Sequence, residues 1–295
     1  MRTLITGANG FLGHHAAHRS CESGRVLALV RRGSSRGGLE SSRLESRLEV
    51  VEWDGRTASL SAIVKRFAPD RVFHLAASYR RSHVPEDVVE LVDANVRLTA
   101  QVLEAAGTAA VVLATSHFMH YGGPRRALNL YAATKLAMLE VARYYGDAQE
   151  RRWGALTLYD VYGPGDTRLK LVDTAITAAR EGRLLRTPAD DPVLRLLHVD
   201  DAVTALHAVA AAVIEDDAWV GQEFAAVPPD GVRMHELLQT VEQVVGRPVR
   251  VDPRPYPSPA RTITDPYVDL PTPPSWSPRI DLLRGLATVV DHGAS

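Results

Sequence analysis

Three glycines, Gly7, Gly10 and Gly13, lie close to the start of the chain, directly after a β-type run from Thr3 to Thr6. The residues that follow have a helical pattern. This order of strand, glycine-rich turn and helix is typical of a site that binds a dinucleotide pyrophosphate at a helix N-terminus. The first glycine allows a tight turn, the second lets the phosphates approach the backbone, and the third lets the helix pack close to the sheet. We therefore expect an α/β fold with a nucleotide cofactor, although a glycine-rich turn without a ligand would have the same spacing.

The alternation of short β-type runs and longer helical patterns continues through the first two thirds of the chain. It predicts βαβ units with right-handed crossovers, which build a Rossmann-like doubly wound parallel sheet. Ligands bind such sheets at the carboxyl ends of the strands. The predicted strands are residues 3–6, 26–30, 48–52, 71–75, 110–114 and 155–159, and the predicted helices include residues 59–67, 88–106 and 132–145.

Two stretches break the alternation. Residues 33–46 are rich in serine, arginine and glycine, which predicts a flexible loop after the second strand. Residues 252–278 hold nine of the eighteen prolines, which predicts an extended, irregular segment in a small, loop-rich substrate lobe. The expected division is a nucleotide-binding domain from residues 1–165 and about 193–215, and a substrate lobe from residues 166–192 and 216–295.

The composition favours a small-molecule partner. The formal net charge of −1 gives no basic surplus for nucleic acid or an anionic membrane. The chain has no long apolar run, and Met1 leads almost directly into the first strand, so we expect a cytoplasmic protein. Cys21 is the only cysteine, which excludes an intrachain disulfide and a cysteine-based metal site. His117 and His120 are close together but have no neighbouring carboxylate or thiol, so no metal is expected.

The second predicted strand ends in Arg31 and Arg32. A site for NAD usually has an acidic residue at this place, about twenty residues beyond the glycines, to accept the ribose hydroxyls. Two guanidinium groups can instead bind the 2′-phosphate of NADP through charge-assisted hydrogen bonds, whereas a carboxylate would repel it. NADP(H) is therefore the expected cofactor, unless the two arginines are only solvated loop side chains.

Two further places are candidates for cofactor contacts. Asp54 follows the third strand, where its carboxylate could accept from an adenine amino group, but it suits a turn equally well. Ala76 and Ala77 end the fourth strand, where small side chains would let the backbone approach the cofactor. Ordinary close packing explains these alanines nearly as well.

A phenol and an ammonium group, Tyr131 and Lys135, are spaced four residues apart and so share one face of a helix. Hydride addition to a carbonyl creates an alkoxide that must be protonated. Tyrosine can supply that proton at neutral pH if a nearby cation stabilises its phenolate. The pair also follows soon after a strand that ends in Thr115 and Ser116, which could bring a hydroxyl to the phenol. These residues predict a proton-transfer site.

The chain resembles the extended short-chain dehydrogenases/reductases of the NAD-dependent epimerase/dehydratase family, from the first glycine loop to about residue 215. The motifs that carry the resemblance are Gly7-x-x-Gly10-x-x-Gly13, His74-Leu75-Ala76-Ala77, Asn95, Thr115-Ser116, Tyr131-x-x-x-Lys135, Tyr162-Gly163-Pro164-Gly165-Asp166 and His198-Val199-Asp200-Asp201. Within that family, the segments Asn129 to Lys135 and Leu158 to Arg168 are similar to nucleotide-sugar 4-ketoreductases of the CDP-abequose and CDP-paratose synthase type.

The resemblance implies a catalytic set of Ser116, Tyr131 and Lys135, in which Tyr131 is the acid/base, Lys135 its electrostatic partner and Ser116 the group that orients the carbonyl. The alternative register puts His117 in the hydroxyl position. Asn95 is expected to kink its helix and support the site, or else to be an ordinary capped or solvent-facing asparagine.

The same resemblance and motifs imply two sets of binding residues. The expected cofactor-binding residues are Gly7, Asn9, Gly10, Phe11, Leu12, Gly13, Arg31, Arg32, Asp54, Gly55, Leu75, Ala76, Ala77, Asn95, Tyr131, Lys135, Asp160 and Val161. The expected substrate-binding residues are Tyr79, Ser116, His117, Arg168, Lys170 and Arg195, of which the last three could donate to a diphosphate or be merely solvated.

The resemblance also distinguishes among the reactions that members of the family catalyse. Family dehydratases have an Asp-Glu pair after the catalytic hydroxyl, and this chain has His117 and Phe118, which disfavours elimination. An epimerase is expected to keep NAD bound by an acidic residue after the second strand. Reduction of a nucleotide-linked 4-keto-6-deoxysugar is therefore expected, with an epimerase, a dehydratase or a non-catalytic NADP(H)-binding sensor as alternatives. Family members usually pair through helices at residues 88–106 and 132–145, so a homodimer is expected.

Overall fold

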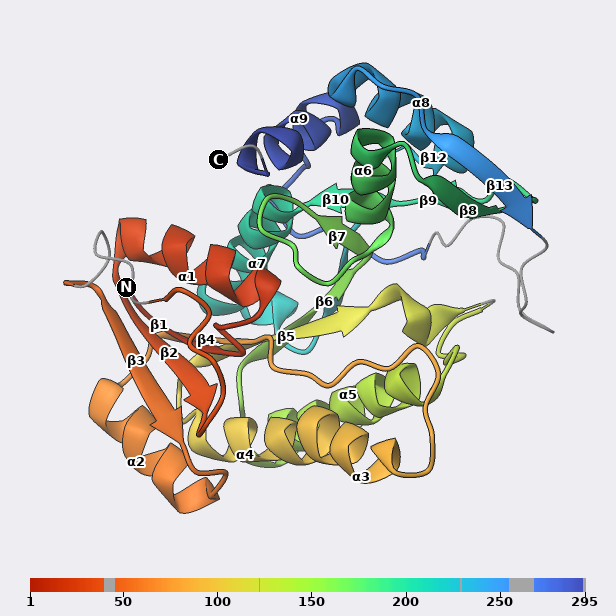
Figure 1. Cartoon of the computed structure of the whole chain (residues 1–295). Helices are drawn as coiled ribbons and strands as arrows, with labels where there is room; N and C mark the ends of the chain where they lie inside the picture. The colour runs from red at the N-terminus through yellow and green to blue at the C-terminus, as the bar shows by residue number, and fades with distance from the viewer. Residues whose placement is uncertain (40–45, 122, 229, 255–267, 294–295) are drawn as a thin grey trace.

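The computed structural model describes residues 1–39, 46–121, 123–228, 230–254 and 268–293. Within these ranges, seven strands form one parallel sheet in the order β11-β6-β5-β4-β1-β2-β3 (Figure 1). The strands are β1 (Arg2–Thr6), β2 (Arg25–Arg31), β3 (Leu48–Trp53), β4 (Arg71–His74), β5 (Ala110–Ser116), β6 (Trp153–Leu158) and β11 (Glu223–Ala226). The six predicted strands are confirmed, and the sheet order has the crossover at β1 that defines a doubly wound fold.

Helices cover both faces of this sheet (Figure 1). On one face, α1 (Phe11–Ser23) and α7 (Val199–Glu215) pack together over a core that includes Ile5, Phe73 and Phe224. On the other face lie α2 (Thr57–Phe67), α4 (Leu98–Ala105) and α5 (Leu130–Gln149), over a core that includes Leu4 and Leu113. Because successive side chains of a strand point to opposite faces, neighbours such as Leu4 and Ile5 enter different cores.

The helix predicted over residues 88–106 is interrupted. It consists of α3 (Asp87–Val92), a π-helical turn η1 (Asp93–Arg97) and α4, which continue one another directly. Such π-helical turns are rare and frequently occur at functional sites. Asn95 is at the centre of this turn.

The second lobe has a hydrophobic core of its own, which includes Ile176, Leu237 and Leu286. Its helices α6 (Leu171–Glu181), α8 (Met234–Val245) and α9 (Leu282–His292) surround that core. Short strand pairs complete it: β7 (Asp160–Tyr162) with β10 (Leu196–His198), β9 (Val193–Leu194) with β12 (Val232–Arg233), and β8 (Leu184–Pro188) with β13 (Arg250–Arg254). Most of the proline-rich segment, residues 255–267, lies outside the described residues.

One strand was assigned to the wrong lobe by the sequence. Residues 223–226, expected in the substrate lobe, form β11 at the edge of the central sheet. β11 pairs with β6 from Glu223 opposite Ala155 to Ala226 opposite Leu158. Phe224 is fully buried there. The apolar run, residues 224–227, is only four residues long, so its burial became visible only through this long-range pairing.

Asp201, in the first turn of α7, is hydrogen-bonded to the segment that leads into α9. Its two carboxylate oxygens accept from the backbone N–H groups of Arg279 and Ile280, each at 3.0 Å. The Trp276 indole donates to the Thr204 hydroxyl at 3.0 Å. These bonds hold the C-terminal segment against the nucleotide-binding domain. Among the helices that the structure describes, none has the length and apolar character that a membrane span requires.

Candidate active site

The glycine loop has the close backbone contacts that its spacing predicts. Gly7 has φ +70°, and a Cβ built on it would lie 2.7 Å from the backbone nitrogen of Ala76. A Cβ on Gly13 would lie 2.1 Å from the carbonyl oxygen of Gly7. Helix α1 begins at Phe11, and its N-cap, Gly10, offers no side chain to cap it. The first N–H groups of α1 are thus available to an anion, as a bound pyrophosphate would require.

Two other segments frame this loop. After β4, Leu75 and Ala76 are half-buried and Ala77 is exposed, and the backbone of Leu75 and Ala76 lies against Gly7. From the loop itself, the Asn9 amide donates to the carbonyl oxygen of Ser35 at 2.8 Å. This bond holds the segment that follows β2 close to the glycine loop.

Arg31 and Arg32 are exposed at the carboxyl end of β2. Asp54, at the end of the neighbouring β3, accepts from a backbone N–H two residues later at 3.0 Å and from the Ser59 hydroxyl. These two hydrogen bonds lower the pKa of Asp54. The carboxylate therefore acts as a turn residue, the alternative that the sequence left open, while Gly55 beside it has φ +86°.

The three residues of the expected catalytic set come together. Ser116 ends β5 and Tyr131 lies in the first turn of α5, where the Ser116 hydroxyl is close enough to lower the pKa of the phenol. The Lys135 ammonium donates to the carbonyl oxygen of Ala114 at 2.9 Å and lies 6.0 Å from the centroid of the Tyr131 ring. This geometry favours the register with Ser116 over the one with His117.

Burial sets the protonation of this group. It raises the pKa of Tyr131, and the neighbouring Tyr79 adds to the rise, whereas the Ser116 hydrogen bond and Arg168 oppose it. Burial also lowers the pKa of Lys135 to about 8. At neutral pH the phenol therefore holds its proton beside a charged lysine. This is the pairing that a proton donor to a nascent alkoxide needs.

Asn95 supports the site from the π-helical turn. Its side chain is fully buried, accepts from the Ser78 N–H at 3.0 Å, and donates to the Ser78 carbonyl at 3.0 Å and the Thr134 hydroxyl at 2.9 Å. The solvent-facing alternative is wrong. Protein groups thus satisfy the hydrogen bonds of the amide, and a direct contact of Asn95 with the cofactor stays a prediction.

Aromatic side chains flank Tyr131. The exposed Tyr79 meets the Tyr131 ring edge to face, with centroids 5.0 Å apart. The buried His117 stacks on Tyr159 at 4.9 Å and contacts the Leu158 carbonyl through Nδ1 at 3.3 Å. Burial lowers the pKa of His117, and the nearby carboxylate of Asp160 opposes this shift. An aromatic-walled site at the end of β6 follows from these contacts.

Arg168 lies beside the glycine loop. Its guanidinium group is 4.5 Å from the centroid of the Phe11 ring and forms two 2.6 Å bonds to the buried carboxylate of Asp166. It also donates to the carbonyl oxygen of Val161 at 3.2 Å. Phe11 and Leu12 pack their half-buried side chains against the core below. Arg168 is thus held in one orientation next to the α1 N-terminus.

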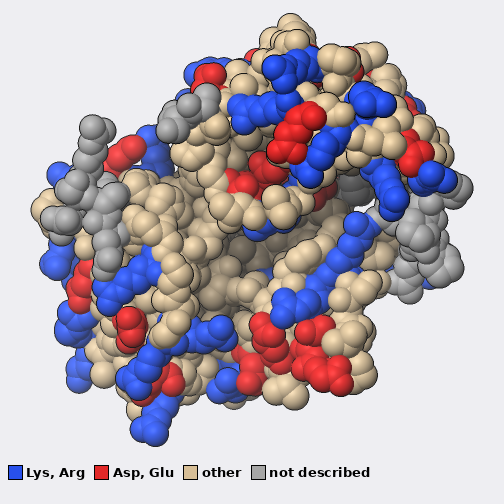
Figure 2. All heavy atoms as spheres, viewed as in Figure 1, with Lys and Arg blue, Asp and Glu red and all other residues tan. Residues whose placement is uncertain are grey.

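The other two expected diphosphate partners occupy different surroundings. Lys170 is half-buried just before α6, and burial, with Arg168 nearby, lowers its pKa. Arg195 is buried and donates to the carbonyl oxygen of Pro228 at 3.1 Å. Figure 2 shows a deep hollow on this face, between the lobe with α6 and the layer with α3 and α5.

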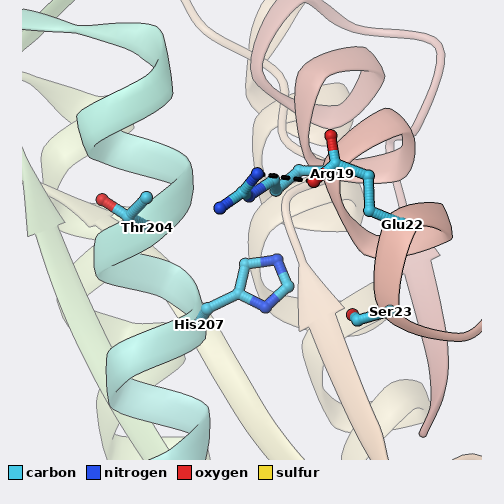
Figure 3. Close-up of a pocket in the computed structure, with 5 residues that line it drawn as sticks. All are labelled: Arg19, Glu22, Ser23, Thr204 and His207. Carbon is cyan, nitrogen blue, oxygen red and sulfur yellow. Dashed lines mark hydrogen bonds and ion pairs between the residues drawn. The ribbon is translucent and has the colours of Figure 1, made fainter.

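A separate cavity of about 300 Å³ lies at the opposite end of α1 from the glycine loop (Figure 3). It is lined by Arg19, Glu22, Ser23, Thr204 and His207. Arg19 and Glu22 form an ion pair with each other, and burial lowers the pKa of His207 to about 3. The residues that line this cavity are all different from those of the site above, so it is not part of that site.

The sequence missed several side chains that hold the site. Ser78 and Thr134 bind Asn95, and His74 and Thr99 are buried beneath them. Thr134 offered a signal, since it lies within the Tyr131-x-x-x-Lys135 segment. Thr99 offered another, because it stands four residues after Asn95, where its hydroxyl can reach the Asn95 carbonyl of the same helix.

Known proteins match the whole of this architecture. Residues 3–220 match the NAD dependent epimerase/dehydratase family. A UDP-glucose 4-epimerase of Mycolicibacterium smegmatis is 27% identical over 99% of this chain and 98% of its own. A CDP-abequose synthase of Yersinia pseudotuberculosis is 26% identical over 70% of this chain and 72% of its own. The structure of a Bacillus cereus UDP-glucuronic acid 4-epimerase with UDP-glucuronic acid and NAD has a TM-score of 0.82 at 20% identity, covering 99% of this chain and 98% of that one.

Proposed function

Because the chain belongs to the NAD dependent epimerase/dehydratase family, we propose that it is an NADPH-dependent reductase of a nucleotide-linked 4-keto-6-deoxysugar. The proposed preference for NADPH over NAD rests on Arg31 and Arg32 at the end of β2. A 2′-phosphate there would meet two cations, and the acidic partner of an NAD ribose is missing from this place. An exchangeable NADPH supports net reduction, which consumes the cofactor at every turnover.

The mechanism uses the residues around Tyr131. A bound NADPH would supply the hydride for the sugar carbonyl carbon. Ser116 orients the carbonyl oxygen, and Tyr131 donates its phenolic proton to that oxygen as negative charge develops on it. Lys135 stabilises the resulting phenolate through its charge. Tyr79, packed edge to face on the Tyr131 ring, helps to orient the phenol.

The two lobes divide the binding work. We propose that Arg168, Lys170 and Arg195 face the nucleotide diphosphate, and that Tyr79 and His117 contact the sugar. Arg168 combines this role with its position beside Phe11 and the glycine loop. In this arrangement the substrate lies in the hollow between the lobes, with its keto group at Tyr131 (Figure 2).

We also propose a cytoplasmic homodimer that contacts neither membrane nor nucleic acid. The outer face of α3 exposes Val88, Val89 and Val92, and α5 exposes Tyr144. Apolar side chains gathered on neighbouring helices are typical of a surface that a second copy covers.

A second candidate function is 4-epimerisation of a nucleotide sugar. The relative from Mycolicibacterium smegmatis, which this chain matches over nearly its whole length, is described as a UDP-glucose 4-epimerase. An epimerase oxidises and then reduces the same carbon, so it needs tightly held NAD and no added reductant. The same Tyr131 and Lys135 would serve both half-reactions.

Measurements of turnover distinguish the reductase from the epimerase. We expect NADPH absorbance at 340 nm to fall when the enzyme meets one member of a panel of nucleotide-linked 4-keto-6-deoxysugars, with the 4-hydroxy sugar as product. Interconversion of UDP-hexoses without added cofactor would instead establish the epimerase. Tight NADPH binding without turnover of any carbonyl would identify a non-catalytic sensor.

The pH dependence should follow Lys135. Burial penalises its charged form, so the lysine loses its proton near pH 8 instead of its usual 10.5. Reduction needs both the Tyr131 phenol and the Lys135 cation. We expect kcat/KM for reduction to be flat below about pH 7 and to fall as pH rises through about 8. NADPH affinity measured over the same pH range is the control, and a rate that climbs through pH 8 would contradict the assignment.

A further inference from the structure

A chain of buried polar side chains lies beneath the site and takes no part in the mechanism above. Thr6, His74 and Thr99 are at most 2% exposed. The His74 ring joins the other two: Nδ1 lies 2.8 Å from the Thr6 hydroxyl and Nε2 lies 3.0 Å from the Thr99 hydroxyl. Thr6 and His74 lie opposite each other on the paired strands β1 and β4, and Thr99 comes from α4, which covers one face of that sheet.

Every proton in the hydrogen bonds between Thr6, His74 and Thr99 can be assigned. The Thr99 hydroxyl donates to the carbonyl oxygen of Asn95 at 2.9 Å, so it must accept from His74 Nε2–H. The imidazole is neutral, because burial and the nearby Lys135 charge lower its pKa to about 3. Its Nδ1 therefore accepts from the Thr6 hydroxyl.

The two ends of this hydrogen-bonded series reach the two halves of the active site. At one end, the Thr6 hydroxyl accepts from the N–H of Ala76 at 3.2 Å, and the Ala76 backbone is the surface on which Gly7 packs. At the other end, the chain terminates on Asn95 in the π-helical turn.

From Asn95 the bonds continue to α5. The Asn95 amide donates to the Thr134 hydroxyl at 2.9 Å, and that hydroxyl donates to the carbonyl oxygen of Tyr131 at 2.7 Å. Hydrogen bonds that meet at Asn95, through its backbone carbonyl on one side and its side-chain amide on the other, thus connect Thr6, directly before the glycine loop, to the backbone of the proposed proton donor.

We propose that His74, together with Thr6 and Thr99, is a positioning unit that fixes the glycine loop relative to Tyr131. A neutral imidazole suits this role because it accepts at one nitrogen and donates at the other, across the gap between two hydroxyls. His74 does not touch substrate or cofactor. It acts through Ala76 and Asn95, and the inference rests on the reductase function proposed above. A shift of about 1 Å between reacting groups can cost on the order of 100-fold in rate.

Paired substitutions of Thr99 test this role. Thr99→Val removes the hydroxyl at constant shape, and we expect kcat to fall roughly tenfold while KM for NADPH changes less than about twofold. Thr99→Ser keeps the hydroxyl and should restore most of kcat. Thr157→Val is the matched control, because Thr157 is fully buried and its hydroxyl bonds only to Thr115 at 2.9 Å among the described contacts. Equal losses of kcat in Thr99→Val and Thr157→Val would overturn the proposal.

A second measurement needs no turnover. In the ¹⁵N spectrum of histidine-labelled protein, His74 should show a protonated Nε2 and an unprotonated Nδ1 throughout pH 5–8 (on the order of two units or more above its pKa). In Thr99→Val the Nε2–H should exchange faster with solvent. A cationic ring or the opposite tautomer would overturn the positioning unit. A correct tautomer in a wild-type protein that reduces no nucleotide sugar would leave the unit supported and count against the proposed function alone.

Discussion

Tyr131→Phe should lower kcat for reduction by roughly 1,000-fold, because it removes the proton donor and leaves the alkoxide to be protonated by water. The ring itself should stay in place against Tyr79, whose centroid lies 5.0 Å away. NADPH affinity should therefore stay within about threefold of wild type, since the phenol adds little to cofactor binding. Single-turnover oxidation of NADPH, with affinity measured by fluorescence titration, separates the two effects.

Tyr145→Phe is the control for this variant. Tyr145 lies on the same helix, and its hydroxyl donates to the exposed carboxylate of Glu104 at 3.0 Å, away from the site. Tyr145→Phe also removes one phenolic oxygen from α5, but away from the site, so kcat of this variant should match that of wild type. If Tyr131→Phe kept more than about a tenth of the wild-type rate, another group would have to be the acid, and the mechanism would be wrong.

The double variant Arg31→Ala/Arg32→Ala should reverse the cofactor preference. Hydrogen bonds to charged groups contribute about 1.5–3 kcal/mol each, so losing both should weaken NADPH binding by roughly 100-fold or more. NADH lacks the 2′-phosphate, so its affinity should change little. The ratio of the two dissociation constants, measured by fluorescence titration, reports the effect directly.

Arg66→Ala controls for the loss of surface charge, since Arg66 lies on α2 and pairs with Glu49. It should leave both affinities unchanged. Equal affinity of the wild-type protein for NADH and NADPH would contradict the proposed role of the arginines. That result would also favour the epimerase, because epimerisation needs tightly held NAD and no added reductant.

The sheet was predictable because its signals are local. Strands β2 and β5 contain unbroken, buried apolar runs, residues 26–30 and 110–114, and such runs bounded by turns or helices predict strands in a parallel sheet. Tyr131 and Lys135 were predictable for a similar reason. Their relation is fixed by one helical turn, which the spacing of the residues already contains.

The network beneath the site was not predictable in this way. His74 bonds to Thr6 across 68 residues and to Thr99 across 25, and Asn95 bonds to Thr134 across 39. A polar residue in a sequence has many potential partners. Only the packing of β1, β4 and the π-helical turn selects one set, because buried polar groups must find hydrogen bonds wherever the fold brings them together.

The sequence by itself determined the glycine loop, the parallel sheet and the facing phenol and lysine, since each depends on neighbours within a few residues. Only the tertiary structure decided that β11 joins the central sheet, that Asp54 serves a turn and that Arg168 lies over Phe11 beside the glycine loop. These outcomes depend on which distant surfaces exclude water together. That contribution to the free energy of folding is set by contacts between segments, and no local pattern records it.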